Sequence, residues 1–194
     1  MIKIIVVAFK RALNLRILID CFLTQTEKRW EMHIIHDGPP PPDVEEVIAM
    51  YKDPRIKFTF TETVNGHWGH PNRNIVLRTF NLTRHEFVLM TNDDNYYVPD
   101  FVRMFLKEGR ANDVGFVYCD TVHSYHKYSV MKTEVRENHI DMGSFMVRMD
   151  VAKKIGFNHL HLSADGTYAV ECANYCRLRH LRLVHVAKPL FVHN

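Results

Sequence analysis

The sequence predicts one α/β domain with a mostly parallel central sheet flanked by helices. Short apolar runs rich in β-branched residues alternate with longer segments whose apolar residues recur at helical spacing. The 194 residues suit a single domain, and no internal repeat or linker divides them. The composition is 46% hydrophobic and 24% charged, which is typical of a chain that buries a sizeable core.

The first strand is expected over Ile2–Ala8, because a continuous run of this kind is typical of a strand buried on both faces. A helix follows over Ala12–Thr26, where apolar residues recur every three or four positions. The second strand, Trp30–His36, ends before four prolines, which cannot donate to a sheet. Asp43 is then the expected N-cap of a helix that reaches about residue 51.

The third strand is expected over Arg55–Phe60, followed by a loop that contains two glycines. Pro71 starts the next helix, since proline suits a first helical turn. The apolar run in Glu86–Met90 predicts a fourth strand that leads into a polar segment. Pro99 opens a further helix, and Asp113–Cys119 predicts the fifth strand.

The pattern changes in the last third of the chain, where polar and aromatic residues are mixed. Thr121–Glu137 indicates a hairpin or a long loop, either a lid over a ligand or an ordinary exposed hairpin. The remaining expected elements are a strand over Met142–Met149, helices over Asp150–Ile155 and Asp165–Leu178, a strand over Leu181–Val186 and an extended piece over Leu190–Val192.

Charge and hydrophobicity exclude several classes of protein. The formal net charge of +3 is too small to indicate a nucleic-acid partner. No apolar run approaches the roughly 18 residues of a membrane helix, and none near the start suits a signal peptide. We therefore expect a cytoplasmic protein with no transmembrane segment, whose cysteines are reduced. The oligomeric state stays open, with a homo-oligomer as one alternative.

Polar clusters follow the predicted strands at the end where ligands bind in open α/β sheets. They comprise Asp37-Gly38, the Gly66–Arg73 segment and Asn92-Asp93-Asp94-Asn95. No glycine-rich dinucleotide or P-loop motif is present, which excludes those two classes. Adjacent carboxylates such as Asp93 and Asp94 favour a divalent ion that bridges a diphosphate. The alternative is that they lie at the N-terminus of a helix, where acidic side chains are favoured.

Several motifs occur in a characteristic order from about Ile2 to His193. They are Ala8-Phe9-Lys10-Arg11, Thr24-Gln25-Thr26, His36-Asp37-Gly38, Gly66 with Pro71-Asn72-Arg73-Asn74, Thr91-Asn92-Asp93-Asp94-Asn95 with Pro99, Gly143-Ser144-Phe145-Met146-Val147-Arg148 with Ile155-Gly156-Phe157, Ser163-Ala164-Asp165, and His193. In this order they resemble the A-type (GT-A) glycosyltransferases, in particular glycosyltransferase family 2.

The resemblance implies a single GT-A domain over residues 1–194, with a nucleotide-binding half at about 1–99 and an acceptor-side half at about 100–194. It implies a metal-dependent transfer of a sugar, with inversion, from a nucleotide-sugar to a saccharide or another hydroxyl acceptor. UDP-sugar is the expected donor, and Mn²⁺ or Mg²⁺ is the expected ion. Two alternatives stay open, a nucleotide-sugar-binding module without turnover and a retaining transferase on the same fold.

The resemblance also implies roles for residues that would bind the nucleotide. Asp37 would accept a hydrogen bond from the nucleobase, and the alternative is that it forms an Asx turn. Ala8 stands where the family often places a hydroxyl that faces the base. Arg73 would lie near the base or the phosphates, where the alternative is an exposed helix arginine. Asp93 would hold ribose hydroxyls.

The remaining roles concern the metal and the chemistry. Asp94 would ligate the metal, and His193 would add a nitrogen ligand unless it belongs to a mobile terminus. Asp165 would be the base that deprotonates the acceptor, where the alternative is that it caps its helix. Asp141 is the next candidate for the base.

Overall fold

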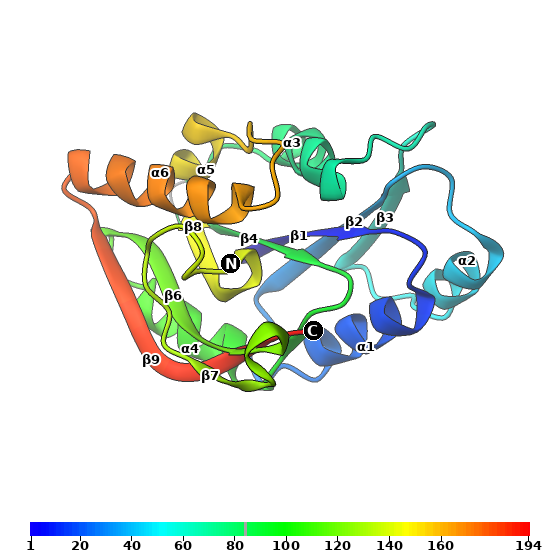
Figure 1. Cartoon of the computed structure of the whole chain (residues 1–194), viewed down its shortest axis with the longest axis horizontal. Helices are drawn as coiled ribbons and strands as arrows, with labels where there is room; N and C mark the ends of the chain where they lie inside the picture. The colour runs from blue at the N-terminus through cyan, green and yellow to red at the C-terminus, as the bar shows by residue number, and fades with distance from the viewer. Residues whose placement is uncertain (84) are drawn as a thin grey trace.

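In the computed structural model, which describes residues 1–83 and 85–194, nine strands form one sheet with helices on both faces (Figure 1). The strands are β1 (Ile2–Ala8), β2 (Trp30–His36), β3 (Ile56–Phe60), β4 (Phe87–Asn92), β5 (Tyr96–Tyr97), β6 (Val114–His123), β7 (Ser129–Met131), β8 (Phe145–Arg148) and β9 (Arg182–His193). Within the described residues, no helix combines the length and the apolar character needed to cross a bilayer.

The helices alternate with the strands along the chain. They are α1 (Ala12–Leu23), α2 (Pro42–Ala49), α3 (His70–Thr79), α4 (Phe101–Glu108), α5 (Met149–Ile155) and α6 (Ala164–Leu178). Three short 3₁₀ turns complete the described elements, η1 (His67–Gly69), η2 (Ser124–His126) and η3 (Met142–Ser144).

The sheet has the strand order β3-β2-β1-β4-β8-β6-β9-β5, and β7 pairs with β6. Pairing is parallel from β3 through β4 and again between β6 and β9. It is antiparallel where β8 lies between β4 and β6, and where β5 meets β9. The sheet is therefore mixed, because β8 runs against the direction of both of its neighbours. The expected parallel arrangement holds for its first half.

Two apolar clusters, one on each face of the sheet, form the core. One combines residues of α1 and α4 with β1, β2 and β9, and includes the buried rings of Phe22, Trp30 and Phe101. The other combines residues of α3, α5 and α6 with the opposite face, and includes Phe145 and Tyr168. Figure 1 shows α3, α5 and α6 above the sheet and α1, α2 and α4 below it.

Two local expectations are wrong. The helix expected to have Asp43 as its N-cap begins at Pro42, with Pro41 at the N-cap position two residues earlier, because proline is already set for a helical first turn. Asp43 lies inside that turn. The strand expected over Met142–Met149 is shorter, because the Asp141 side chain accepts the Gly143 N–H and holds residues 142–144 in the turn η3.

Long-range pairing explains three further differences from expectation, all in strands. The two separate segments expected after residue 180 form one strand, β9, which follows β6 past an irregularity at Pro189. The expected fifth strand extends to His123, because β9 and β7 pair with its end. The two-residue strand β5 has no local signal and exists through its pairing with β9.

The parallel strands bring the polar clusters together. Ala8 at the end of β1 is in register with His36 at the end of β2, and Val7 is in register with Asn92 at the end of β4. The residues that follow β2 and β4 therefore flank the end of β1. The chain passes from β1 to β2 on one side and returns to β4 on the other, and ligands bind at such a switch point.

Candidate functional site

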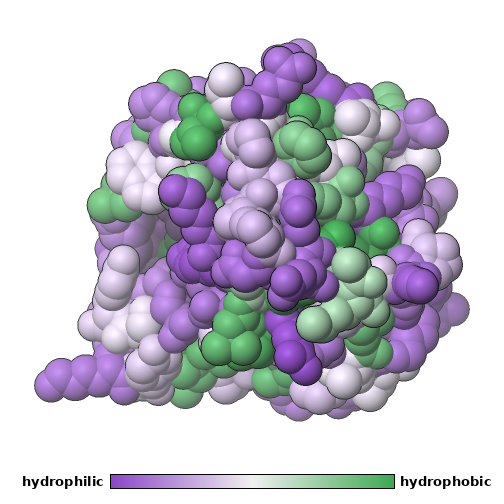
Figure 2. All heavy atoms as spheres, turned by 90° about the vertical axis from the view of Figure 1, so that its right-hand side faces the viewer, coloured by the Kyte–Doolittle hydropathy of each residue, from purple (hydrophilic) through white to green (hydrophobic). Residues whose placement is uncertain are grey.

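A cleft of about 910 Å³ opens at the carboxyl ends of the parallel strands. Figure 2 looks onto the end of the molecule at which β1 and β2 finish, where hydrophilic and hydrophobic side chains are interspersed. Six of the seven predicted site residues line the cleft, namely Ala8, Asp37, Arg73, Asp94, Asp165 and His193. The fold thus gathers in one place residues from both ends of the sequence.

Asp37 directly follows β2 and is almost fully buried. Its carboxylate accepts hydrogen bonds from the backbone N–H groups of Asn65 (2.8 Å) and Gly66 (3.0 Å) and from the side-chain amide of Asn72 (2.9 Å). These partners lie far along the chain, so Asp37 anchors the loop before α3. A carboxylate has about four acceptor positions, so one remains for a donor in the cleft. The Ala8 carbonyl fixes Asp37 by accepting its backbone N–H at 2.9 Å.

Arg73 projects from α3 and is only 1% exposed, which contradicts the alternative of a surface arginine. Its guanidinium donates to the Asn92 side chain at 2.6 Å and to the Trp68 carbonyl at 3.2 Å. Burial lowers the pKa of Arg73 to about 10, against the opposing fields of Asp165 and Asp141. The guanidinium stays charged at neutral pH and balances these two carboxylates.

The Asp93–Asp94 pair does not cap a helix, since α4 begins only at Phe101. Asp93 is fully buried, accepts the Phe9 N–H at 2.9 Å and lies 2.5 Å from the Arg11 guanidinium. Burial raises its pKa to about 6, although Arg11 opposes the shift. Asp94 also pairs with Arg11, but its side chain lines the cleft. The structure therefore places Asp93 behind the cleft wall and Asp94 inside it.

Asp165 is the second residue of α6, and Ser163 holds the N-cap position. Asp165 is therefore not the helix cap, although its carboxylate accepts the Gly166 N–H at 2.8 Å. Burial and the nearby charge of Asp141 hold its pKa well above the ordinary range, and Arg73 opposes this shift. A carboxylate in such surroundings has an increased proton affinity, which suits a general base.

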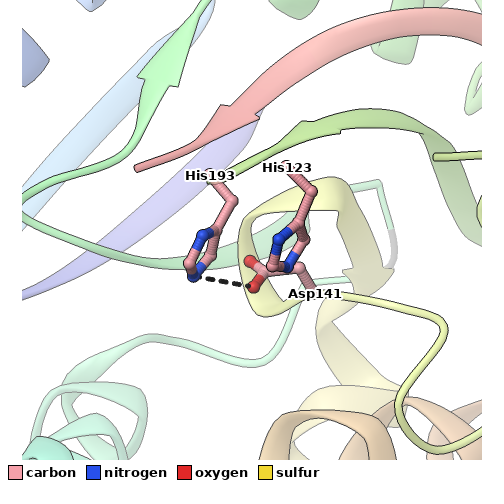
Figure 3. A group of neighbouring side chains, drawn as sticks. All are labelled: His123, Asp141 and His193. Atoms are coloured by element: carbon pink, nitrogen blue, oxygen red, sulfur yellow. Dashed lines mark ion pairs between the residues drawn. The ribbon is translucent and has the colours of Figure 1, made fainter. Parts of the chain in front are cut away.

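His193 is the last residue of β9, so it does not belong to a loose terminus. Its Nε2 lies 3.6 Å from Asp141 Oδ2 (Figure 3). Its Nδ1 lies 3.0 Å from the Ser124 hydroxyl. The ring of His123 stacks against it, with centroids 4.2 Å apart. Burial lowers the pKa of His193, so the ring is neutral near pH 7 and has a lone pair available for a metal.

Sequence reasoning missed two residues that the structure brings to the site. Arg11 forms ion pairs with both aspartates of the Asp-rich motif, and His123 stacks on His193. Arg11 belongs to the first of the motifs that carry the resemblance, but no role was assigned to it, and His123 is one histidine among 13. The partners of both lie at least 70 residues away in the sequence, so no local pattern indicated these contacts.

Gly69 has a left-handed backbone (φ +70°) and packs directly on β1, since a Cβ there would lie 2.1 Å from Val7 Cγ1. We expect Gly69→Ala to lower the free energy of unfolding by about 1–3 kcal/mol from overpacking, with backbone strain in addition. Urea unfolding measures this loss. In the double variant Val7→Ala/Gly69→Ala the smaller side chain at position 7 makes room for the new methyl group. The loss in unfolding free energy of the double variant should therefore be smaller than the sum of the losses in the two single variants. Strictly additive losses would show that contact with Val7 is not what requires glycine at position 69.

One comparison with known proteins shows the family of the chain. The family model described as "Glycosyl transferase family 2" matches residues 3–167, which is most of the chain. No curated protein sequence gives a significant match.

Solved structures share the fold at low sequence identity. S. aureus TarS 1–349 has a TM-score of 0.76 and 15% identity over 100% of this chain and 60% of that one. The same fragment in complex with UDP-GlcNAc has a TM-score of 0.74 and 15% identity over 100% of this chain and 58% of that one. The mannosyltransferase PcManGT from Pyrobaculum calidifontis, in complex with GDP-Man and Mn²⁺, has a TM-score of 0.73 and 15% identity over 99% of this chain and 56% of that one. The chain thus spans no more than 60% of the length of these structures.

Proposed function

The chain belongs to glycosyl transferase family 2, and from this premise we propose that it transfers a sugar from a nucleotide-sugar to an acceptor hydroxyl. The observation that carries the proposal is the convergence of Asp37, Asp94 and Asp165 on one cleft at the switch point of the sheet. Each offers a carboxylate to a different group: Asp37 to the nucleobase, Asp94 to the metal at the diphosphate, and Asp165 to the acceptor hydroxyl.

For the donor we propose a UDP-sugar. The free acceptor position of Asp37 suits the imide N–H of uracil, and Ala8 lines the same wall of the cleft. The carboxylate of Asp93 binds the Phe9 N–H and the Arg11 side chain. Asp93 would therefore support the ribose indirectly, by holding the turn after β1 in place. Arg73 acts from the floor of the cleft, where its charge balances the carboxylates.

The donor set at the diphosphate end fits a divalent ion, either Mn²⁺ or Mg²⁺. Asp94 supplies a carboxylate inside the cleft, and His193 supplies a neutral imidazole within the field of Asp94. Such an ion, when bound, acts as a Lewis acid that stabilises the departing diphosphate. Asp94 and His193 would hold it, and Asp94 would give up its pairing with Arg11 to do so.

The chemical step needs a base on the acceptor side. We assign this role to Asp165, which would take the proton of the acceptor hydroxyl as its oxygen attacks the anomeric carbon. Attack opposite the diphosphate inverts the configuration at that carbon. Arg73 would stabilise the ionised form of Asp165 between turnovers.

Asp37 tests the donor assignment. We expect the chain to bind UDP more tightly than GDP or ADP, and Asp37→Ala to remove about tenfold in UDP affinity by loss of a hydrogen bond to a charged group. Isothermal titration calorimetry with the three diphosphates measures both effects. Asp53→Ala, which removes a carboxylate paired with Arg55 outside the cleft, is the control. Equal affinity for all three diphosphates in the unmodified chain would reject uracil recognition.

A further inference from the structure

We propose that His123, Asp141 and His193 form a cation centre that binds a transition-metal ion before any nucleotide arrives. Each of the three offers one ligand atom, and these atoms all lie within 4.8 Å of one another (Figure 3). They come from three separate segments, the end of β6, the turn before η3 and the end of β9. We call these three residues the His–Asp–His centre.

The spacing of the His–Asp–His centre suits one shared ion. Ligand atoms about 2.1 Å from the same metal lie roughly 3.0–3.6 Å apart. Asp141 Oδ2 and His193 Nε2 are 3.6 Å apart, so this pair is already at such a separation. The ring of His123 stacks on that of His193, with 8° between the ring planes, so it must turn out of this stack to direct a nitrogen at an ion shared with His193.

Two of the three ligands are oriented by a second partner, as metal ligands commonly are. The Nδ1 of His193 contacts the Ser124 hydroxyl, which leaves Nε2 directed toward Asp141. Asp141 accepts the Gly143 N–H through Oδ1 at 3.0 Å, which leaves Oδ2 directed toward His193. The atoms that face the centre are therefore those not used elsewhere.

His123 requires one further adjustment. Its Nδ1 accepts the backbone N–H of Tyr125 at 3.2 Å, so the neutral ring carries its proton on Nε2. Coordination through Nε2 moves this proton to Nδ1 and ends the contact with Tyr125. The cost is one backbone hydrogen bond in an exposed turn, since Tyr125 is 85% exposed.

The charges around the centre also favour a cation. The field of Asp94 reaches both Asp141 and His193, and Asp165 adds a further negative charge. Within the described residues Arg73 is the cation whose field opposes them at Asp141. A divalent ion among these carboxylates reduces their mutual repulsion.

The ligand types predict which ion is bound. Two imidazoles and one carboxylate suit Mn²⁺, Co²⁺ or Zn²⁺, whereas Mg²⁺ prefers oxygen ligands alone. The ion is the one that Asp94 and His193 would hold in the proposed function, and its position beside the diphosphate rests on that function. The centre adds His123 and Asp141 as ligands and makes the metal resident before the nucleotide binds. Binding of the ion itself can be measured without nucleotide.

Mn²⁺ binding to the full, nucleotide-free chain tests the centre. We expect calorimetry and the loss of the free-ion electron paramagnetic resonance signal to report one site, with Mg²⁺ competing poorly. His123→Ala and Asp141→Asn should each weaken Mn²⁺ binding about tenfold or more. His185→Gln is the matched control, because His185 also pairs with an aspartate, Asp120, outside the centre, and it should bind Mn²⁺ like the unmodified chain.

Two outcomes would overturn the centre, namely no Mn²⁺ binding without nucleotide, or undiminished binding in His123→Ala. Because His123 is at the end of a strand beside an exposed turn, its variant should fold even if Asp141→Asn does not, and circular dichroism checks this. The proposed function fails separately. A chain that binds Mn²⁺ through these residues but turns over no nucleotide-sugar would retain the centre and reject the transferase.

Discussion

Asp165→Asn is expected to lower the rate of sugar transfer by about 10²–10⁴-fold while leaving the binding of UDP and Mn²⁺ intact. The amide has the shape of the carboxylate but cannot accept the acceptor proton. Its carbonyl oxygen can still accept the Gly166 N–H, so the start of α6 should be preserved. Transfer rates at saturating donor and Mn²⁺, together with calorimetric UDP affinities, separate the two effects.

The same variant should not lose stability at neutral pH. The pKa of Asp165 is raised in the folded chain, so folding favours the protonated form and ionisation costs stability as the pH rises above the ordinary range of a carboxylic acid. The neutral Asn avoids this cost, and thermal unfolding at pH 7.5 should show a melting temperature at or above that of the unmodified chain. A sharp fall would assign Asp165 a structural role.

Asp150→Asn is the matched control for the transfer measurement, because Asp150 on α5 pairs with Arg148 at the end of β8 and does not line the cleft. It should leave transfer unchanged. Near-normal turnover by Asp165→Asn would reject Asp165 as the base. In that case Asp141, whose pKa is also raised by burial, would be the next residue to test, and a role as the base would exclude it as a ligand of the His–Asp–His centre.

Asp94→Ala is expected to lower transfer with Mn²⁺ by about 10²-fold or more, because metal stabilisation of a departing charge is a matter of several kcal/mol. In the unmodified chain Mn²⁺ should strengthen UDP binding, and in the variant this enhancement should be lost. Calorimetry of UDP with Mn²⁺ and with a chelator measures the enhancement directly.

Arg11 provides the control for Asp94. Removing Asp94 leaves Arg11 paired with Asp93 alone, so a guanidinium that contacts the diphosphate could replace part of the metal effect. The double variant Arg11→Gln/Asp94→Ala excludes this route and should bind UDP weakly under both conditions. An undiminished Mn²⁺ effect in Asp94→Ala would place the metal on other residues.

Strong local patterns made the first half of the fold predictable. β1 and β2 have the predicted bounds, because buried parallel strands are continuous apolar runs. β9 was predicted as two pieces, because exposed Ala187, Lys188 and Pro189 interrupt its apolar pattern while pairing with β6 continues past them. Such pairing is a property of the folded sheet and leaves no trace in a short window of sequence.

Some residues of the candidate site could also be predicted from the sequence, whereas others could not. Asp37 and Asp94 lie within two residues of a strand end and Asp165 lies in the first turn of a helix, so motif order was enough to single them out. The His–Asp–His centre depends on the end of β9 returning beside the end of β6, which only the sheet topology shows. The burial of Arg73 was not predictable either, because its partners, the Asn92 side chain and the Trp68 carbonyl, are brought together by folding.

Turnover of a nucleotide-sugar is the most direct test of the central claim. The chain would be incubated with Mn²⁺ and a panel of UDP-sugars and GDP-mannose, with simple saccharides or water as acceptor, and followed by proton NMR at the anomeric signals. We expect release of UDP and a product sugar whose anomeric configuration is opposite to that of the donor. Saturable UDP-sugar binding with every donor left intact would contradict it and indicate a binding module, and a product of unchanged configuration would contradict inversion.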